Sequence, residues 1–214
     1  MRIGISRLHF PVNTLGPGRR IGIWLQGCSI HCPGCVSRDT WPAAEDSQKV
    51  DIGQVLQWCA RFASGADGVT ITGGEPLDQV APLEEFVQGL KESEALEHLD
   101  VLLYSGYSLG EAKLRSPLVF DIVDASITEP FVSSQMTDLV WRGSGNQVLT
   151  MLTDRGRQLF GPFVNKRAKE PEIQLSIASG TVWSVGIPRG KTMPNFKRAM
   201  NDHGVVLKGC SWQR

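Results

Sequence analysis

The stretch IGIWLQGCSIHCPGC, residues 21–35, decides how the rest of the sequence is interpreted. Its first part, residues 21–26, predicts a strand that ends at a glycine. Three cysteines with the spacing C-x3-C-x2-C follow at once, and they are Cys28, Cys32 and Cys35. Glycine and proline between them favour the tight loop that lets several thiolates converge. Three thiolates on a loop after a strand indicate a metal or redox site.

Three cysteines suit a [4Fe–4S] cluster that keeps one iron open. Cubane clusters usually have four cysteine ligands, so with three ligands one iron keeps a coordination position for a substrate. A zinc site that adds His31 is a second interpretation, although His31 lies between two of the cysteines and this spacing is uncommon in zinc fingers. Free buried cysteines are a third. Cys59 falls on the apolar face of a predicted helix, which indicates a core position.

Composition limits the class of protein. The chain has 214 residues, of which 41% are hydrophobic and 21% charged, so it can bury a core. Its 22 basic and 22 acidic residues balance, which argues against a protein that mainly binds nucleic acid or an anionic membrane. It has no signal-peptide core at its start, and no apolar run near the roughly 20 residues that span a bilayer. We therefore expect a cytoplasmic protein.

Strands and helices alternate along the first two thirds of the chain. Further strands are predicted over residues 68–72, 101–104, 120–127 and 147–152, and helices over residues 51–64, 83–96 and 109–114. This alternation predicts a parallel sheet with helical crossovers. A complete eight-unit barrel needs roughly 250 residues. We therefore expect an α/β fold that forms a partial, open β/α barrel.

The C-terminal part has a different pattern. A β-hairpin is predicted over residues 172–177 and 181–187, with residues 178–180 as its turn, and a helix over residues 195–203. Residues 155–171 are rich in charge and contain two prolines, which is typical of a linker. We expect residues 1–160 to form the partial barrel and residues 161–214 to form an extension packed on it.

Four motifs stand in a fixed order along the chain. They are GPGRRIGIWLQGCSIHCPGCVSRDTW at residues 16–41, TGGEPL at 72–77, YSGY at 104–107 and WRGSGNQ at 141–147. Together they resemble the radical S-adenosylmethionine (SAM) activating enzymes, and most of all the activating proteins of anaerobic ribonucleotide reductases. The resemblance covers roughly residues 12–152. It departs from the family at Val36, where an aromatic residue is common, and at DASITEPF, residues 124–131, where those proteins tend to have glycine before Pro-Phe.

The resemblance implies a site. Cys28, Cys32 and Cys35 would hold the [4Fe–4S] cluster as catalytic ligands, and SAM would chelate the open iron. Gly73 and Gly74 would present backbone N–H groups to SAM, and Glu75 would orient its ammonium group. Further contacts to SAM or substrate are expected from Pro76, Ser105, Asp124, Thr128 and Asn146. The polar residues Arg142, Ser144, Asn146 and Gln147 would close over the site or meet a partner, or else form a solvated turn. Trp41 would shield the cluster or pack in the core.

The resemblance also implies an activity. A flavodoxin- or ferredoxin-type reductant would supply an electron for cleavage of SAM to a 5′-deoxyadenosyl radical. That radical would generate a glycyl radical on a partner enzyme, an anaerobic ribonucleotide reductase. The C-terminal extension favours an alternative, a radical SAM enzyme that modifies a peptide, a nucleoside or another glycyl radical enzyme. A zinc module or a simple ferredoxin is a third interpretation. A ferredoxin has no need of the glycine-rich SAM turn that this sequence contains. No membrane or direct nucleic-acid partner is expected.

Overall fold

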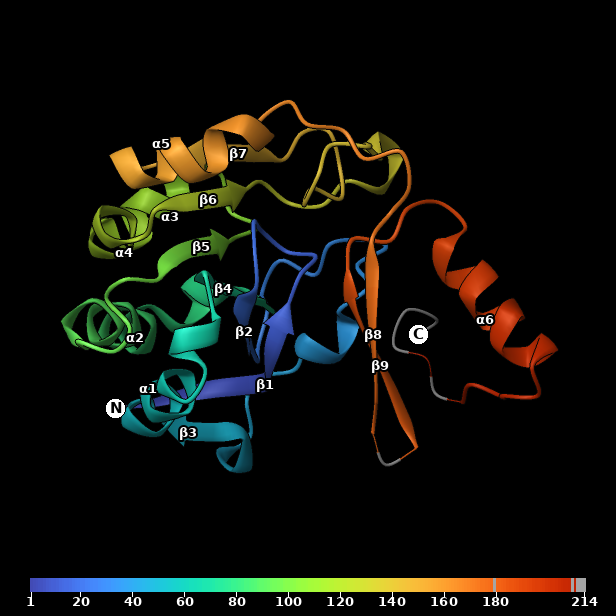
Figure 1. Ribbon diagram of the computed structural model, residues 1–214, viewed down its shortest axis with the longest axis horizontal. Helices are drawn as coiled ribbons and strands as arrows, with labels where there is room; N and C mark the ends of the chain where they lie inside the picture. The colour runs from blue at the N-terminus through green and yellow to red at the C-terminus, as the bar shows by residue number, and fades with distance from the viewer. Residues whose placement is uncertain (179, 209, 211–214) are drawn as a thin grey trace.

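The fold is organised around one seven-stranded sheet with the order β3-β1-β2-β4-β5-β6-β7. The computed structural model describes residues 1–178, 180–208 and 210. The sheet strands are β1 (Arg2–Val12), β2 (Arg20–Leu25), β3 (Lys49–Asp51), β4 (Gly68–Gly73), β5 (Asp100–Tyr104), β6 (Ala125–Thr128) and β7 (Val148–Met151). The helices are α1 (Ile52–Ala60), α2 (Val80–Glu92), α3 (Leu109–Arg115), α4 (Pro117–Ile122), α5 (Asp154–Phe160) and α6 (Thr192–Asp202). Figure 1 shows α1, α2 and α4 along one side of this sheet.

The centre of the sheet is parallel, as the alternation of strands and helices predicted. Strands β2, β4, β5 and β6 pair in parallel, whereas β1, β3 and β7 are antiparallel to their neighbours. The prediction of a mixed α/β fold is therefore confirmed. Strands β1 and β3 were not predicted, and in the described part of the chain they extend the sheet beyond β2.

Alternate residues of β2 serve the two faces of the sheet. Ile21, Ile23 and Leu25 point into the main core, which α1, α2, α3 and α4 cover. Burying each of these side chains contributes about 1.5–3 kcal/mol. Trp24 points to the other face and packs in a smaller cluster with Val185 of the C-terminal hairpin.

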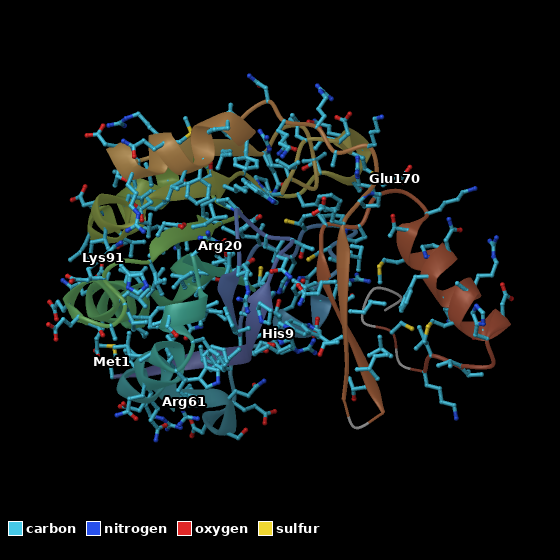
Figure 2. The ribbon with its side chains drawn as sticks, in the orientation of Figure 1. Met1, His9, Arg20, Arg61, Lys91 and Glu170 are labelled. Carbon is cyan, nitrogen blue, oxygen red and sulfur yellow. The ribbon has the colours of Figure 1, made fainter. Side chains whose placement is uncertain are left out.

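A buried ion pair ties the amino ends of three parallel strands together. The Arg20 guanidinium lies 2.6 Å from the Asp100 carboxylate, and both side chains are almost fully buried. Arg20 also donates to Thr70 Oγ1 at 2.6 Å and to the Val69 carbonyl at 2.8 Å, which satisfies a charge that would otherwise be costly in the interior. Figure 2 shows Arg20 in the middle of the molecule. A Cβ atom at Gly68 would stand 2.6 Å from Arg20 Nη1, so this position requires glycine.

One strand prediction was wrong in its bounds. Residues 120–127 were expected to form a strand, but α4 occupies Pro117–Ile122 and β6 begins only at Ala125. The helix is explained by its start, because the Ser116 hydroxyl accepts a hydrogen bond from the Val119 N–H and Pro117 occupies a first-turn position. The predicted linker, residues 155–171, likewise contains most of α5.

The C-terminal hairpin and helix are present. Strands β8 (Ile173–Ala178) and β9 (Thr181–Gly186) pair antiparallel, and α6 begins at Thr192 rather than at residue 195. Residue 179, which was predicted in the turn, lies outside the described residues. Gln174 of β8 donates to the Pro11 carbonyl at 2.7 Å and accepts from the Asn13 N–H at 3.1 Å. The hairpin therefore attaches to the end of β1, on the side of the sheet opposite α1 and α2 (Figure 1).

Candidate functional site

The three cysteines lie on the loop that follows β2, at the carboxyl edge of the parallel strands. Leu25 at the end of β2 pairs with Gly73 at the end of β4, so the cysteine loop and the TGGEPL turn begin side by side. In open α/β sheets ligands bind at this edge. The returning chain closes the loop, because the Gly27 and Cys28 N–H groups donate to the Thr40 and Trp41 carbonyls at 2.8 and 3.1 Å.

The loop brings the thiols towards one space. Gly27 and Gly34 have φ values of 104° and 83°, which a residue with a side chain rarely adopts. Burial raises the pKa of the Cys35 thiol, and the neighbouring Cys32 and Cys28 raise it further by electrostatic repulsion between thiolates. All three cysteines are half-buried and free of disulfides. They therefore lie within electrostatic range of one another while remaining accessible.

Donors around the sulfurs suit an iron–sulfur cluster. The Ser37 N–H donates to Cys35 Sγ at 3.4 Å, and backbone N–H groups of Ile30 and His31 lower the pKa of Cys28 against the larger effect of burial. The indole N–H of Trp41 is buried and has no partner of ordinary hydrogen-bond geometry among the described residues, yet it lies close enough to Cys35 to lower the pKa of that thiol. Hydrogen bonds to sulfur are one means by which proteins set the potential of such clusters.

The geometry argues against a single zinc ion. Within the described ranges, no three His, Cys, Asp or Glu side chains converge closely enough to hold one metal ion. Tetrahedral zinc with Zn–S bonds of about 2.3 Å requires sulfurs only about 3.8 Å apart. A cubane binds each thiolate through a different iron, so its cysteines stand further from one another. His31 stacks on Trp41, with ring centroids 4.6 Å apart.

The two glycines of TGGEPL serve the packing of main chain against main chain. A Cβ atom at Gly74 would stand 2.0 Å from the Gly27 carbonyl oxygen, and one at Gly73 would stand 2.3 Å from the Leu25 nitrogen. The Gly74 N–H donates to the Leu25 carbonyl at 2.9 Å. The Gly74 N–H, which was expected to face SAM, is therefore bonded to the last residue of β2 instead. Glycine is required here because the two backbones touch.

Glu75 is a buried carboxylate at the start of the next turn. Its side chain is 1% exposed and accepts hydrogen bonds from the Leu77 N–H, the Ser105 hydroxyl and the Gly106 N–H at 2.9, 2.9 and 2.7 Å. Burial raises the pKa of Glu75 to about 7 in spite of these donors. No ion pair to Glu75 occurs among the residues that the structure describes. A buried carboxylate with donors but no cation suits a ligand that carries an ammonium group.

Ser105 and Pro76 support this carboxylate. Ser105 is 5% exposed and donates to Glu75, and its predicted contact to SAM stays a prediction. Pro76 is buried and opens a short 3-10 turn over Pro76–Gln79, which Glu75 caps through the Leu77 N–H. Both residues fix the direction of the Glu75 side chain.

Asp124 is at the wrong end of the sheet to contact a ligand at the cysteine loop. Its carboxylate accepts from the Val101 N–H at 2.9 Å and from the Thr153 hydroxyl at 2.7 Å, and Lys91 lies 3.5 Å away. The register places Asp124 level with Val69, four residues before Gly73, or about 13 Å along the strands. Figure 2 shows Lys91 on the side of the molecule opposite the hairpin. The predicted SAM contact is therefore corrected to a structural role.

Thr128 and Asn146 each hold a buried polar atom without a protein partner. Thr128 ends β6 and is fully buried, and its hydroxyl has no hydrogen bond in the described structure. The Asn146 amide donates to the Pro130 carbonyl at 2.8 Å, while its Oδ1 atom lacks a partner there. Both remain candidate ligand contacts.

The WRGSGNQ loop braces the segment that follows β6. Arg142 is 4% exposed and donates to the Val164 carbonyl at 2.7 Å, and Ser144 is fully buried and accepts from the Val132 N–H at 3.0 Å. Gln147 donates to the Glu129 carbonyl at 3.2 Å. Arg142, Ser144 and Gln147 therefore bond to the neighbouring backbone, whereas Asn146 Oδ1 lacks a partner in the described structure.

This bracing places Phe131 beside the cysteine loop. A Cβ atom at Gly143 would stand 2.9 Å from the Phe131 ring, and one at Gly34 would stand 3.5 Å from it. Glu129 has a φ of 85°, in the left-handed region that glycine adopts without strain. The departure noted in DASITEPF therefore falls on a position where the backbone itself favours glycine.

Sequence reasoning missed three residues at the site. Asp78 accepts hydrogen bonds from the Ser29 N–H at 2.7 Å, the Ser29 hydroxyl at 2.9 Å and the Tyr107 hydroxyl at 2.9 Å. Tyr107 ends the YSGY motif, and Ser29 follows Cys28. The signal was present, since all three lie within or directly after motifs that had been singled out.

Comparison with known proteins gives one matching family and several relatives that share one name. The pattern of a family described as "4Fe-4S single cluster domain" matches residues 14–150. The anaerobic ribonucleoside-triphosphate reductase-activating protein of Escherichia coli (strain K12) is 28% identical over 147 residues, which cover 66% of this chain and 94% of that protein. The protein of the same name from Enterobacteria phage T4 is 30% identical over 145 residues, which cover 65% of this chain and 88% of that protein.

A solved structure, QueE from Escherichia coli, aligns with a TM-score of 0.40 at 22% identity. That alignment covers 50% of this chain and 53% of QueE. Among the described residues, no helix is both long and apolar enough to cross a membrane.

Proposed function

We propose that this chain, which belongs to the 4Fe-4S single cluster domain family, is a radical SAM enzyme and an activase. Its similarity to anaerobic ribonucleoside-triphosphate reductase-activating proteins supports the proposal. Cys28, Cys32 and Cys35 would hold one [4Fe–4S] cluster with an open iron. The enzyme would cleave SAM reductively and generate a glycyl radical on a partner such as an anaerobic ribonucleotide reductase. A flavodoxin- or ferredoxin-type protein would supply the electron.

One observation carries this proposal: the buried Glu75 carboxylate lies directly against the cysteine loop. The Glu75 N–H donates to the Gly27 carbonyl at 2.8 Å, and the Glu75 charge raises the pKa of Cys28. An ammonium group bound at Glu75 would therefore stand next to the thiolate ligands. SAM carries both the ammonium group and the carboxylate that an open iron accepts.

The residues of the chain perform distinct tasks in this proposal. When bound, the cluster would supply the electron for the reductive cleavage of SAM to methionine and a 5′-deoxyadenosyl radical. Glu75 orients the ammonium group, and the Gly73–Gly74 backbone keeps the cysteine loop and the Glu75 turn in register. Phe131 and Trp41 cover the loop and limit the access of water. Thr128 and Asn146 offer unsatisfied polar atoms to the bound molecule or the substrate.

We further propose that residues 1–160 form a partial barrel of the radical SAM type and that residues 161–214 form an extension packed on it. The parallel strands β2, β4, β5 and β6 support the first part. The contact of Gln174 with the end of β1 and that of Val185 with Trp24 support the second.

SAM cleavage tests the proposal. The chain would be purified anaerobically, reconstituted with iron and sulfide, and mixed with SAM and dithionite while 5′-deoxyadenosine is measured by chromatography. Cys32→Ala should abolish the product, and Glu75→Gln should weaken SAM binding while the iron content stays that of the wild type. Absence of a SAM-dependent change in the electron paramagnetic resonance (EPR) spectrum of the intact reduced cluster would refute the proposal.

A different substrate is the second candidate function. The relatives match about two thirds of this chain, and the part beyond residue 150 builds the hairpin and α6. Trp183 of this part stacks edge-on against Trp24 with ring centroids 4.9 Å apart, so the extension contacts the sheet itself. Incubation with an anaerobic ribonucleotide reductase, SAM and reductant decides between the two. A glycyl radical EPR signal supports the reductase, and its absence while SAM is cleaved supports another substrate.

A further inference from the structure

A hydrogen-bond cluster joins the cysteine loop to the YSGY turn. Asp78 Oδ2 accepts from the Ser29 N–H at 2.7 Å, and Oδ1 accepts from the Ser29 and Tyr107 hydroxyls, each at 2.9 Å. The two hydroxyls lie 3.0 Å from each other. The guanidinium of Arg115 lies 3.7 Å from the centre of the Tyr107 ring. Because Ser29 directly follows Cys28, this cluster holds the first residue after a proposed cluster ligand.

The same turn holds the Glu75 carboxylate with its other groups. Ser105 Oγ donates to Glu75 Oε1 at 2.9 Å, and the Gly106 N–H donates to Oε2 at 2.7 Å. The Tyr107 N–H in turn donates to Ser105 Oγ at 3.1 Å. Three consecutive residues therefore connect Glu75 at one end with Asp78 and Ser29 at the other.

The turn also packs directly on the cysteine loop. A Cβ atom at Gly106 would stand 2.6 Å from Ile30 Cδ1, so Ile30 of the cysteine loop packs directly over Gly106. A displacement of the turn cannot leave the cysteine loop unchanged, since both hydrogen bonds and van der Waals contact join them.

We infer that Asp78 and Tyr107 are positioning residues that couple an ammonium group at Glu75 to the conformation of the loop at Cys28. The inference rests on the proposed function and deepens it, because it names the relay between the site of the SAM amine and a cluster ligand. Binding of the amine fixes Glu75, Glu75 fixes Ser105 and Gly106, and Tyr107 passes this restraint through Asp78 to Ser29.

The coupling is measurable in the metal-free chain by a double-mutant cycle. Ser105→Ala removes a donor to Glu75, and Tyr107→Phe removes only the hydroxyl that contacts Asp78. The readout is the hydrogen-exchange rate of the Ser29 amide, whose donor bond ends on Asp78. Ser105→Ala should speed this exchange about fivefold in the wild type and less than about twofold in the Tyr107→Phe background.

A neighbouring substitution controls for loss of stability. Ser108 caps α3 through the Glu111 N–H at 3.3 Å and takes no part in the cluster of Ser29, Asp78 and Tyr107. Ser108→Ala should lower the midpoint of thermal unfolding. The hydrogen-exchange rate of the Ser29 amide should stay the same as in the wild type. Equal, additive effects of Ser105→Ala in the two backgrounds would overturn the relay.

A second arm uses the reconstituted protein and SAM itself. SAM affinity is read from the EPR spectrum of the reduced cluster. Tyr107→Phe should weaken SAM binding about tenfold at unchanged iron content, and Ser108→Ala should stay within about twofold of the wild type. Unchanged affinity in Tyr107→Phe overturns the relay. A wild type that shows no response to SAM refutes the proposed function instead, and the exchange cycle then still decides whether the two ends of the turn are coupled.

Discussion

The pH dependence of stability in the metal-free chain should carry the signature of Glu75. Burial raises the pKa of its carboxyl from 4.5 to about 7, so the folded chain binds this proton more tightly than the unfolded chain does. The resulting stabilisation is complete below pH 4.5 and disappears as the pH rises through about 7. At about 1.4 kcal/mol for each pH unit between the two pKa values, the loss amounts to about 3 kcal/mol.

Glu75→Gln removes the titration and supplies the reference. The substituted amide can no longer accept one of the hydrogen bonds that Glu75 accepts. This lowers the free energy of unfolding by an amount that does not depend on pH. Urea unfolding, followed by tryptophan fluorescence under reducing conditions between pH 4 and 8, gives the free energy of unfolding of both proteins. The wild type should lose about 3 kcal/mol relative to Glu75→Gln across this range.

An exposed glutamate of α2 provides the matched control. The profile of Glu92→Gln should run parallel to that of the wild type, because this side chain is exposed in the folded chain. Profiles of wild type and Glu75→Gln that stay parallel within about 0.5 kcal/mol would refute the reasoning. They would mean that the carboxylate meets water or a cation in the folded chain.

Three further substitutions test other features. Glu129→Gly should raise the free energy of unfolding by about 0.5–1 kcal/mol, since glycine accepts a φ of 85° without strain; a lower urea midpoint would contradict this. Gly74→Ala should reduce the iron bound after reconstitution severalfold, because its Cβ would stand 2.0 Å from the Gly27 carbonyl oxygen; full iron content with a wild-type spectrum would show that the loop adapts. Trp183→Ala should speed hydrogen exchange in residues 173–186, since Trp183 packs on His9 and Trp24; unchanged exchange would show that Gln174 alone holds the hairpin.

The cysteine loop and the Glu75 turn were predictable because both follow strands that local sequence marks clearly. Parallel pairing of those strands then places their carboxyl ends together, as the register of Leu25 and Gly73 confirms. The use of the Gly74 N–H was not predictable in the same way. A glycine pair is compatible with an approaching ligand and with an approaching backbone, and only the tertiary structure distinguishes these cases.

The predicted contact of Asp124 with SAM was wrong for a related reason. The strand was predicted from residue 120, whereas α4 takes the first part of that segment and β6 starts at Ala125. Asp124 therefore precedes its strand and bonds to the amino end of β5. Strand β1 escaped prediction because its arginines and His9 interrupt the apolar pattern, and it is stabilised by pairing with β2 and β3 on either side.

The burial of Arg142 and Ser144 shows what a motif alone leaves open. Arginine and serine in a glycine-rich segment are typical of a solvated loop or of a binding loop. Here their hydrogen bonds go to the backbone at Val164 and Val132, residues far from them in the chain. The sequence carries no local signal for such long-range partners.

The attachment of the hairpin to β1 has a consequence for synthesis on the ribosome. Gln174 and Pro11 are separated by 163 residues, whereas the hydrogen bonds that join Glu75, Asp78 and Ser29 to residues 105–107 need no residue beyond 107. Domains form from the amino end as the chain is made. These contacts between the cysteine loop and residues 105–107 can therefore form on the nascent chain before β8 and β9, which pack against Trp24, have been synthesised.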